Sequence, residues 1–338
     1  MPNTQPLLSI IIVSYNTSDL TVQTLESVVA DLHRSQLLAE KSQIIIVDNH
    51  SKDDSLAAIR KCFAQLHWSA FHIIENHENL GFAKANNQAI RLYPANYYFL
   101  LNSDTIVQKA ALEQMLKTFQ KYPVNEASAN LERNQGKIDR LGILAATLLN
   151  QDETLQPQGG SLPSLRTIAA QMFFLDDLPW LGRYFPSTQH TGLSDFAFKT
   201  YQRGLSRLIQ KDWVGGTAMM IRQEVVEEIG DLDENIFMYG EDQEYCMRAH
   251  YHHYDVAIDP QAAIIHLGSA SSSSKNAIIG ELRGYIYIFH KHMPNWKMPI
   301  LRIILFLGVQ LRIFLYNVLH QPAKAAVYKE TAKVLASL

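Results

Sequence analysis

Tyr97-Tyr98-Phe99-Leu100-Leu101-Asn102-Ser103-Asp104 is the stretch that decides the fold. Its first five residues are apolar or aromatic, which is typical of a buried β-strand, and a polar triplet follows at once. Open α/β sheets bind ligands at the carboxyl ends of their strands, so Asp104 is expected at a binding site. One such carboxylate can hold a divalent cation that bridges it to a phosphate. Taken alone, the triplet is more typical of a polar turn that caps the next helix.

Three units of strand, polar turn and helix precede this stretch. The strands are expected at residues 8–13, 44–47 and 71–74, because these runs are apolar and rich in β-branched residues. Each is followed by turn or helix-capping residues and then by a helical pattern. This alternation predicts an α/β fold with a mainly parallel central sheet flanked by helices on both faces.

The second half of the chain shows a less regular pattern. Residues 126–207 predict a loop-rich insertion that faces an acceptor. The pair Gly215-Gly216 opens an apolar run, which indicates close approach of a ligand or another backbone. A helix is expected at residues 223–229, a helix start at Gly240-Glu241-Asp242, and a last strand at residues 262–265 before His266. The serines at 269–274 predict a flexible boundary.

Two apolar helical segments follow this boundary. Leu282, Tyr285, Ile286 and Phe289 recur at the spacing of an amphipathic helix, and residues 300–319 are largely apolar. Arg302, Gln310 and Arg312 interrupt the second segment and fall within about 160° on a helical wheel. The stretch between the arginines is far shorter than the ~20 residues of a spanning helix. The pattern favours a helix that lies in the membrane interface, and a buried or dimer-forming helix fits equally well.

Composition narrows the class of protein. The chain has 338 residues, of which 47% are hydrophobic, and a formal net charge of −3. A substantial core is therefore expected, and the absence of a long basic run argues against a nucleic-acid partner. Cys62 and Cys246 are the only cysteines, which fits a reducing compartment. The N-terminal residues lack the pattern of a signal peptide, so a cytoplasmic location is expected.

Seven short motifs occur in a fixed order along nearly the whole chain. They resemble those of GT-A-fold family 2 glycosyltransferases, particularly the bacterial rhamnosyltransferase-like branch that elongates cell-surface polysaccharides. The motifs are Val13-Ser14-Tyr15-Asn16, Val47-Asp48-Asn49-His50-Ser51, Asn79-Leu80-Gly81-Phe82-Ala83-Lys84-Ala85-Asn86-Asn87, Leu101-Asn102-Ser103-Asp104, Gly215-Gly216-Thr217-Ala218-Met219, Phe237-Met238-Tyr239-Gly240-Glu241-Asp242 and Ile265-His266.

The resemblance implies a division into domains. Residues 1–274 would form the GT-A domain, with a nucleotide-sugar-binding half at 1–125 and an acceptor-binding half at 126–274. Residues 275–338 would form a helical region that associates with the inner face of the cell membrane. Partners would be a nucleotide-sugar donor, plausibly dTDP-rhamnose, and a lipid-linked or polysaccharide acceptor, while a homo-oligomer is left open.

The resemblance also implies a donor site. Asp48 would meet the edge of a pyrimidine base, with the turn at residues 14–16 beside it, and Gly81 would let the backbone approach the diphosphate at a helix start. Lys84 would add charge, although a solvated helix lysine is the more ordinary reading. The full donor set is Ser14, Tyr15, Asn16, Asp48, Asn79, Gly81, Lys84, Asn87, Asn102, Ser103 and Asp104.

A divalent metal, Mn²⁺ or Mg²⁺, is the implied cofactor. Asp104 matches the last position of the family's Asp-X-Asp motif, whereas Asn102 stands where the first aspartate would be. His266 is the implied second protein ligand, and imidazole suits manganese better than magnesium. A lone histidine after a strand is as often structural.

Catalysis is assigned to Glu241 and Asp242. In the resemblance, Asp242 is the general base that takes the proton of the acceptor hydroxyl, and a single displacement inverts the anomeric centre. Acidic residues at a helix start also complement the helix dipole, by under about 1 kcal/mol when exposed. Trp213, Gly215 and Gly216 would shape the acceptor side, with a core role for Trp213 equally compatible.

Two other classes of protein are alternatives to a glycosyltransferase. A catalytically silent sugar-nucleotide-binding or scaffold protein could share this fold, although Asp104 and Asp242 argue for turnover. An NAD-dependent oxidoreductase ranks far lower, because no Gly-X-Gly-X-X-Gly follows the first strand.

Overall fold

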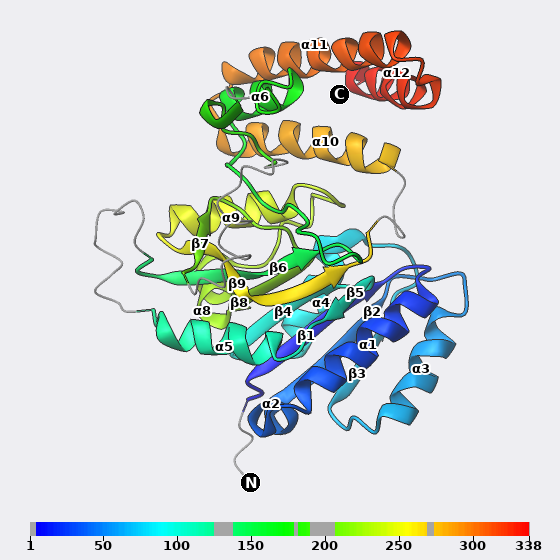
Figure 1. Cartoon of the computed structure of the whole chain (residues 1–338), viewed down its shortest axis with the longest axis vertical. Helices are drawn as coiled ribbons and strands as arrows, with labels where there is room; N and C mark the ends of the chain where they lie inside the picture. Colours follow the sequence, from blue (N-terminus) through cyan, green and yellow to red (C-terminus); the bar gives the residue numbers. More distant parts are fainter. Residues whose placement is uncertain (1–4, 125–137, 179–181, 190–206, 269–273, 338) are drawn as a thin grey trace.

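The computed structural model describes residues 5–124, 138–178, 182–189, 207–268 and 274–337. Its strands form one mixed sheet in the order β3-β2-β1-β4-β8-β6-β9-β5, with β7 paired to β9 (Figure 1). The strands are β1 (Leu8–Ser14), β2 (Ser42–Asp48), β3 (Phe71–Glu75), β4 (Tyr97–Asn102), β5 (Thr105–Val107), β6 (Leu141–Leu149), β7 (Ile209–Lys211), β8 (Ala218–Arg222) and β9 (Asp255–His266).

The first half of this sheet agrees with the expected parallel arrangement. β1 pairs in parallel with both β2 and β4, and β2 pairs in parallel with β3. Ser14 therefore lies level with Asp48, and Val13 lies level with Asn102. The carboxyl ends of three strands meet at one edge, which is where the polar motifs follow them.

The second half departs from that expectation. β8 runs antiparallel to β4 and to β6, while β6 runs parallel to the long strand β9. β6 is buried along its whole length and was not predicted as a strand. Its sequence has no polar alternation, and a short, wholly apolar run does not distinguish a strand from a buried helix.

Helices cover both faces of the sheet. The β1 side chains Leu8, Ile10 and Ile12 pack into one core, and the intervening Ile11 packs into the other. The first core is covered by α1 (Ser18–Leu32), α3 (Ser55–Leu66) and α5 (Ala111–Lys121), with α2 (Gln36–Lys41) beside α1. The second is covered by α4 (Gly81–Leu92), α8 (Gln223–Ile229) and α9 (Glu241–Tyr251).

A helical cap lies above α9 at one end of the molecule (Figure 1). It consists of α6 (Leu165–Met172), α10 (Ser274–His292), α11 (Lys297–Val318) and α12 (Pro322–Ser337). Ile168 and Met172 of α6 share a hydrophobic core with Tyr285, Phe289 and Leu305. The cap therefore takes one helix from the middle of the chain, where the sequence predicted an insertion. The expected boundary at residues 269–274 falls almost entirely outside the described residues.

Arg312 does not lie on an exposed polar face, so the helical-wheel interpretation of α11 is wrong at this residue. Its guanidinium is buried and donates hydrogen bonds to the carbonyl oxygens of Gln171, at 2.8 Å, and Met172. It also stacks on Phe174 at 4.3 Å from the ring centroid. The last carbonyls of a helix need donors and favour positive charge, which explains a buried arginine at the end of α6.

α11 leaves a broad apolar face exposed. Ile303 is 58% exposed and Phe314 is 63% exposed, although both are large hydrophobic side chains. Ile300, Phe306, Leu307 and Val318 are exposed as well. Among the described residues, α11 is the one helix whose length and composition would allow it to cross a membrane.

Candidate active site

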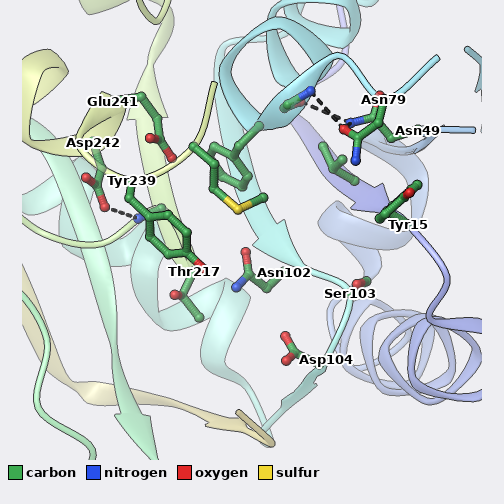
Figure 2. A pocket seen from close by; sticks show the side chains of 15 residues that line it. Tyr15, Asn49, Asn79, Asn102, Ser103, Asp104, Thr217, Tyr239, Glu241 and Asp242 are labelled. Carbon is green, nitrogen blue, oxygen red and sulfur yellow. Dashed lines mark hydrogen bonds between the residues drawn. The ribbon is translucent and has the colours of Figure 1, made fainter. Parts of the chain in front are cut away.

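A cleft of about 220 Å³ opens where β1, β4 and the start of α9 meet (Figure 2). Its lining combines residues from both halves of the sheet. These are Val13, Tyr15, Asn49, Asn79, Gly81, Phe82, Asn102, Ser103, Asp104, Gly216, Thr217, Met238, Tyr239, Glu241 and Asp242.

Asp104 lines one side of this cleft, and His266, which lines a neighbouring cleft, lies against it. Asp104 is buried in the turn between β4 and β5, and β5 pairs antiparallel with β9, so that Thr105 lies level with His266. The distance between His266 Nε2 and Asp104 Oδ1 is 3.4 Å. The Leu267 N–H donates to the Asp104 carbonyl at 2.9 Å and holds the turn against the end of β9.

The donor set of this pair fits a divalent cation of the manganese or magnesium type. Carboxylate oxygen and imidazole nitrogen suit such ions. No group of three or more His, Cys, Asp or Glu side chains with ligand spacing occurs in the described part of the chain. From the described residues, this pair would supply two ligands, and phosphate oxygens and water would supply others.

Asn102 and Ser103 lie beside Asp104 in the cleft. The Asn102 N–H donates to the Thr217 carbonyl at 2.9 Å, which joins the end of β4 to the loop before β8. The Asn102 side chain points into the cleft between Thr217 and Asp104 (Figure 2). The Ser103 hydroxyl accepts a hydrogen bond from Thr17 at 3.0 Å, so part of its capacity serves the protein.

Asp48 carries a buried acceptor with no protein partner. Its Oδ2 accepts from the Ser51 N–H at 3.2 Å, whereas Oδ1 has no hydrogen-bond partner among the described residues. A buried carboxylate oxygen without a donor is costly, and a ligand N–H would satisfy it. This supports a contact with the edge of a base, although Asp48 itself is not part of the cleft lining.

Asn49 links the β2 turn to the start of α4 and was not singled out from the sequence. Its Nδ2 donates to Asn79 Oδ1 at 2.9 Å and to the Gly81 carbonyl at 3.1 Å, and its Oδ1 accepts from the Leu80 N–H at 3.0 Å. It therefore fixes the position of Asn79 in the cleft (Figure 2). The sequence signal that could have identified it is its position next to Asp48 in the motif at residues 47–51.

The turn at residues 14–16 divides into one rim residue and two structural ones. Tyr15 lines the cleft and is 36% exposed. Ser14 is buried with its hydroxyl bonded to Thr17 and Thr21, and Asn16 accepts from the Lys52 N–H at 2.7 Å. These hydrogen bonds hold the β1 turn, and the donor contacts predicted for Ser14 and Asn16 stay predictions.

Gly81 adopts φ +80 and permits a close contact within the protein. A Cβ there would lie 2.2 Å from the Phe237 carbonyl oxygen. The Gly81 N–H donates to Asn79 Oδ1 at 3.0 Å, and the Phe82 N–H donates to the Phe237 carbonyl at 2.9 Å. Gly81 therefore allows a close approach within the chain's own backbone, and these two N–H groups are already used. Gly81 also lines the cleft, and its predicted contact with a diphosphate stays a prediction.

Two further predicted donor residues lie outside the cleft lining. Asn87 is fully buried, where its amide donates to the Leu232 carbonyl at 2.9 Å and to Glu234 at 3.1 Å, and its oxygen accepts from the Leu232 N–H. Its polar atoms thus hold α4 to the loop before α9. Lys84 is exposed on the surface of α4.

Glu241 and Asp242 form the opposite wall of the cleft at the start of α9. Asp242 Oδ1 accepts from the Gln243 N–H at 2.8 Å. Its Oδ2 accepts from the Gly216 N–H at 3.3 Å (Figure 2). Glu241 is buried, and its Oε2 has no partner among the described residues. Burial raises the pKa of both carboxyls, and the Asp242 charge raises the pKa of Glu241 further.

The glycine pair and Trp213 take different places. Gly216 lines the cleft, and a Cβ there would meet the Phe82 ring at 2.9 Å. A Cβ on Gly215 would lie 3.9 Å from Asp242 Oδ2, so Gly215 keeps the surroundings of that carboxylate open. Trp213 is buried in the core and donates from Nε1 to the Thr188 carbonyl at 2.7 Å. The structure therefore favours the core role of Trp213.

The turn before Glu241 is braced by the cap. Tyr239 and Gly240 both have positive φ, at 70 and 113. A Cβ on Gly284 of α10 would lie 2.5 Å from the Tyr239 carbonyl oxygen, and one on Gly280 would lie 2.5 Å from the Tyr239 ring. Gly280 and Gly284 are four residues apart, a spacing that allows close contact at a helix face, and this signal was missed in the sequence.

Comparison with known proteins bears on this site. Residues 9–168 match the family described as "Glycosyl transferase family 2". Among curated proteins, the chain is 31% identical over 135 residues to poly-β-1,6-N-acetyl-D-glucosamine synthase of Staphylococcus aureus (strain MSSA476), which covers 40% of this chain and 31% of that protein. It is 27% identical over 124 residues to Protein CgeD of Bacillus subtilis (strain 168), covering 36% of this chain and 28% of that protein. The chain thus spans about a third of the length of these relatives.

Two solved structures show the same fold. A mannosyltransferase from Pyrobaculum calidifontis, solved with GDP-Man and Mn²⁺, superimposes with a TM-score of 0.53 and 15% identity, covering 99% of this chain and 76% of that one. GalNAc-T7, solved with UDP, GalNAc and Mn²⁺, gives a TM-score of 0.57 and 13% identity, covering 85% of this chain and 48% of that one. The predicted GT-A fold is confirmed.

Proposed function

We propose that this chain, a glycosyltransferase with a family 2 domain over residues 9–168, transfers a sugar with inversion from a nucleoside diphosphate donor to a cell-surface glycan acceptor. The observation that carries the proposal is one cleft with two acidic sides. Asp104 lies on the first side, with His266 of a neighbouring cleft against it, and Glu241 and Asp242 lie on the second. A cation-binding pair next to a proton acceptor suits displacement of a diphosphate by a hydroxyl group.

Asp104 and His266 would hold the divalent cation on the donor side. Bound Mn²⁺ or Mg²⁺ would neutralise the diphosphate leaving group. Asp48 would accept the base N–H through its unpartnered Oδ1, which suits the N3–H of uracil or thymine. The solved neighbours contain GDP-Man and UDP with Mn²⁺, which supports a nucleotide diphosphate and a divalent ion in this class of fold.

Asp242 would be the general base. The N–H groups of Gln243 and Gly216 donate to its carboxylate and favour the charged form. Burial and the Asp242 charge both disfavour ionisation of Glu241. Asp242 therefore ionises before Glu241 as the pH rises. An ionised Asp242 can take the acceptor proton, and a neutral Glu241 can donate a hydrogen bond to the acceptor.

The donor is a sugar nucleotide with a pyrimidine base. The motif resemblance favours dTDP-rhamnose, whereas the Staphylococcus aureus relative is named for an N-acetylglucosamine polymer. A panel of dTDP-rhamnose, UDP-N-acetylglucosamine, UDP-glucose and GDP-mannose, screened by ligand-observed NMR with and without Mn²⁺, tests this proposal. Preferential binding of GDP-mannose would refute the pyrimidine base. Binding without turnover on any glycan or lipid-linked acceptor would favour a silent sugar-nucleotide-binding protein.

The acceptor would be membrane-borne, with the cap resting on the inner face of an anionic bilayer. The exposed apolar face of α11 supports contact with a bilayer, and so does the positive charge of the C-terminal helices. From Lys291 to the C-terminus the sequence has seven lysines and arginines and one acidic residue, Glu330, in a chain of net charge −3. Arg312 is buried and Lys291 pairs with Asp233 and Glu244, so the surplus is carried by the other five: Lys297, Arg302, Lys324, Lys329 and Lys333. An apolar helix face with a basic surplus matches anionic lipid headgroups.

Surface variants of α11 test membrane binding better than truncation does. Removing α11 and α12 would expose Tyr285 and Phe289, whereas Ile303→Glu with Phe314→Glu changes only exposed side chains. Flotation with phosphatidylglycerol vesicles should recover the wild type and not the double variant. Ala323→Glu with Ala326→Glu, on exposed positions of α12, is the matched control. Equal flotation of all proteins, or a wild-type dimer that the double variant dissociates, would refute membrane docking through this face.

A further inference from the structure

A row of hydrogen bonds leads away from His266 into a second, open cleft. His266 Nδ1 lies 2.7 Å from Gln156 Oε1, and Gln156 Nε2 lies 3.2 Å from Asn150 Oδ1. Asn150 Nδ2 lies 2.9 Å from Thr154 Oγ1, which lies 2.5 Å from Asp152 Oδ1. Asn150, Asp152, Gln156 and His266 all line this second cleft.

Backbone pairing holds these side chains in place. The Asn150 N–H donates to the Thr154 carbonyl at 2.8 Å, and the Gln156 N–H donates to the Leu148 carbonyl at 2.8 Å, so residues 148–156 form a closed turn. β6 and β9 run parallel, with Leu149 level with Ile265. This register places the turn next to His266.

The anchored end of the row sets the direction of every bond. Hydrogen bonds from Thr154 lower the pKa of Asp152, so this carboxylate is charged and only accepts. The single hydroxyl proton of Thr154 is used for Asp152, and Thr154 must accept from Asn150 Nδ2. Asn150 Oδ1 then accepts from Gln156 Nε2, which leaves Gln156 Oε1 facing the imidazole as an acceptor. Nδ1 of His266 must therefore carry a proton.

We propose that Gln156 is a positioning residue that holds the Nδ1–H of His266, with the row from Asn150 to Asp152 holding the Gln156 amide in its orientation. Nε2 of His266 then faces Asp104 Oδ1 at 3.4 Å. A cation bound between them would take Nε2 and the carboxylate oxygen as ligands. This inference rests on the proposed cation site, and it assigns the geometry of that site to residues outside the family motifs.

The tautomer is measurable on the metal-free protein. Two-bond ¹H–¹⁵N correlation NMR near neutral pH distinguishes the Nδ1–H, Nε2–H and doubly protonated forms, and the His266→Gln variant identifies the His266 signal. The wild type should show Nδ1–H. Gln156→Leu should lose it, Gln156→Glu should restore it because a carboxylate also accepts, and Gln151→Ala, in the same cleft but outside the row, should leave it unchanged.

Mn²⁺ binding by the protein alone gives a second readout. Electron paramagnetic resonance titration should show about 10- to 100-fold weaker affinity in Gln156→Leu and wild-type affinity in Gln151→Ala. Thermal melts establish that each variant is folded. A wild-type His266 that carries its proton on Nε2 alone would overturn the proposal, and so would a Gln156→Leu protein with unchanged tautomer and Mn²⁺ affinity.

These readouts are independent of turnover. A protein that shows the Nδ1–H form and its loss in Gln156→Leu supports the positioning role even if no donor is consumed. That result would count only against the proposed activity.

Discussion

Asp242→Asn is the substitution that tests the catalytic assignment most directly. The asparagine oxygen can still accept from the N–H groups of Gln243 and Gly216, at 2.8 Å and 3.3 Å in the wild type, so the start of α9 should keep its geometry. The variant loses only the ability to take a proton. Donor binding should be nearly unchanged, because the Asp104 side of the cleft is untouched.

The expected loss in kcat is about 10²- to 10⁴-fold, the contribution of a positioned general base. This corresponds to about 3–5 kcal/mol of transition-state stabilisation. Single-turnover rates with the preferred donor measure the loss, and isothermal titration with the nucleotide diphosphate and Mn²⁺ measures donor affinity. Glu241→Gln is the matched control, because it removes the neighbouring carboxyl and leaves Asp242 in place.

The pH dependence gives an independent check. Burial raises the pKa of Asp242, so the acid limb of the wild-type rate should lie above the ordinary range of aspartate. A carboxyl with a raised pKa favours the folded state when protonated and opposes folding as the pH rises through that pKa. Asp242→Asn should thus unfold at a higher temperature than the wild type near neutral pH. An unchanged single-turnover rate, or lost nucleotide binding with catalysis retained, would refute the reasoning.

Three further predictions follow from the cleft and its supports. Asp104→Ala should abolish Mn²⁺-dependent donor binding in isothermal titration, and full wild-type activity in excess chelator would contradict the cation site. Gly284→Ala places a Cβ 2.5 Å from the Tyr239 carbonyl oxygen and should lower kcat. It should also lower the free energy of unfolding, measured by urea titration, by about 1–3 kcal/mol. Wild-type values for both would show that α10 does not brace the turn. Trp213→Phe leaves the buried Thr188 carbonyl without its 2.7 Å donor. It should lower the free energy of unfolding by about 1–3 kcal/mol and leave KM for the acceptor unchanged. A raised KM with unchanged stability would instead support an acceptor role for Trp213.

The half of the fold before Asp104 was predictable because its information is local. The runs at residues 8–13 and 44–47 have strand composition and are followed by turn residues, and both appear as β1 and β2. β6 and α6 were missed because their states depend on partners distant in the chain. β6 pairs with β8 and β9, and α6 is held by Arg312.

The site divides in the same way. Asp104, Asn102 and Asp242 reach the cleft as expected, because each follows a strand or starts a helix at a definite edge. Asn16 and Asn87 carry the same amide group, but the Asn16 oxygen accepts from the Lys52 N–H and the Asn87 amide is bonded to the loop at Leu232. An amide in a motif has the same sequence signal whether it faces a ligand or a neighbouring loop, so only the structure separates the two.

The bond from Arg312 to the end of α6 has an evolutionary consequence. The family match stops at residue 168, inside α6, whereas the packing unit to which α6 belongs extends to the last described helix. Recombination at the end of the matched segment would separate the Gln171 and Met172 carbonyls from their donor. Residues 165–172 and position 312 should therefore be inherited together. Homologous chains that lack an arginine at position 312 should show a compensating change at the end of α6.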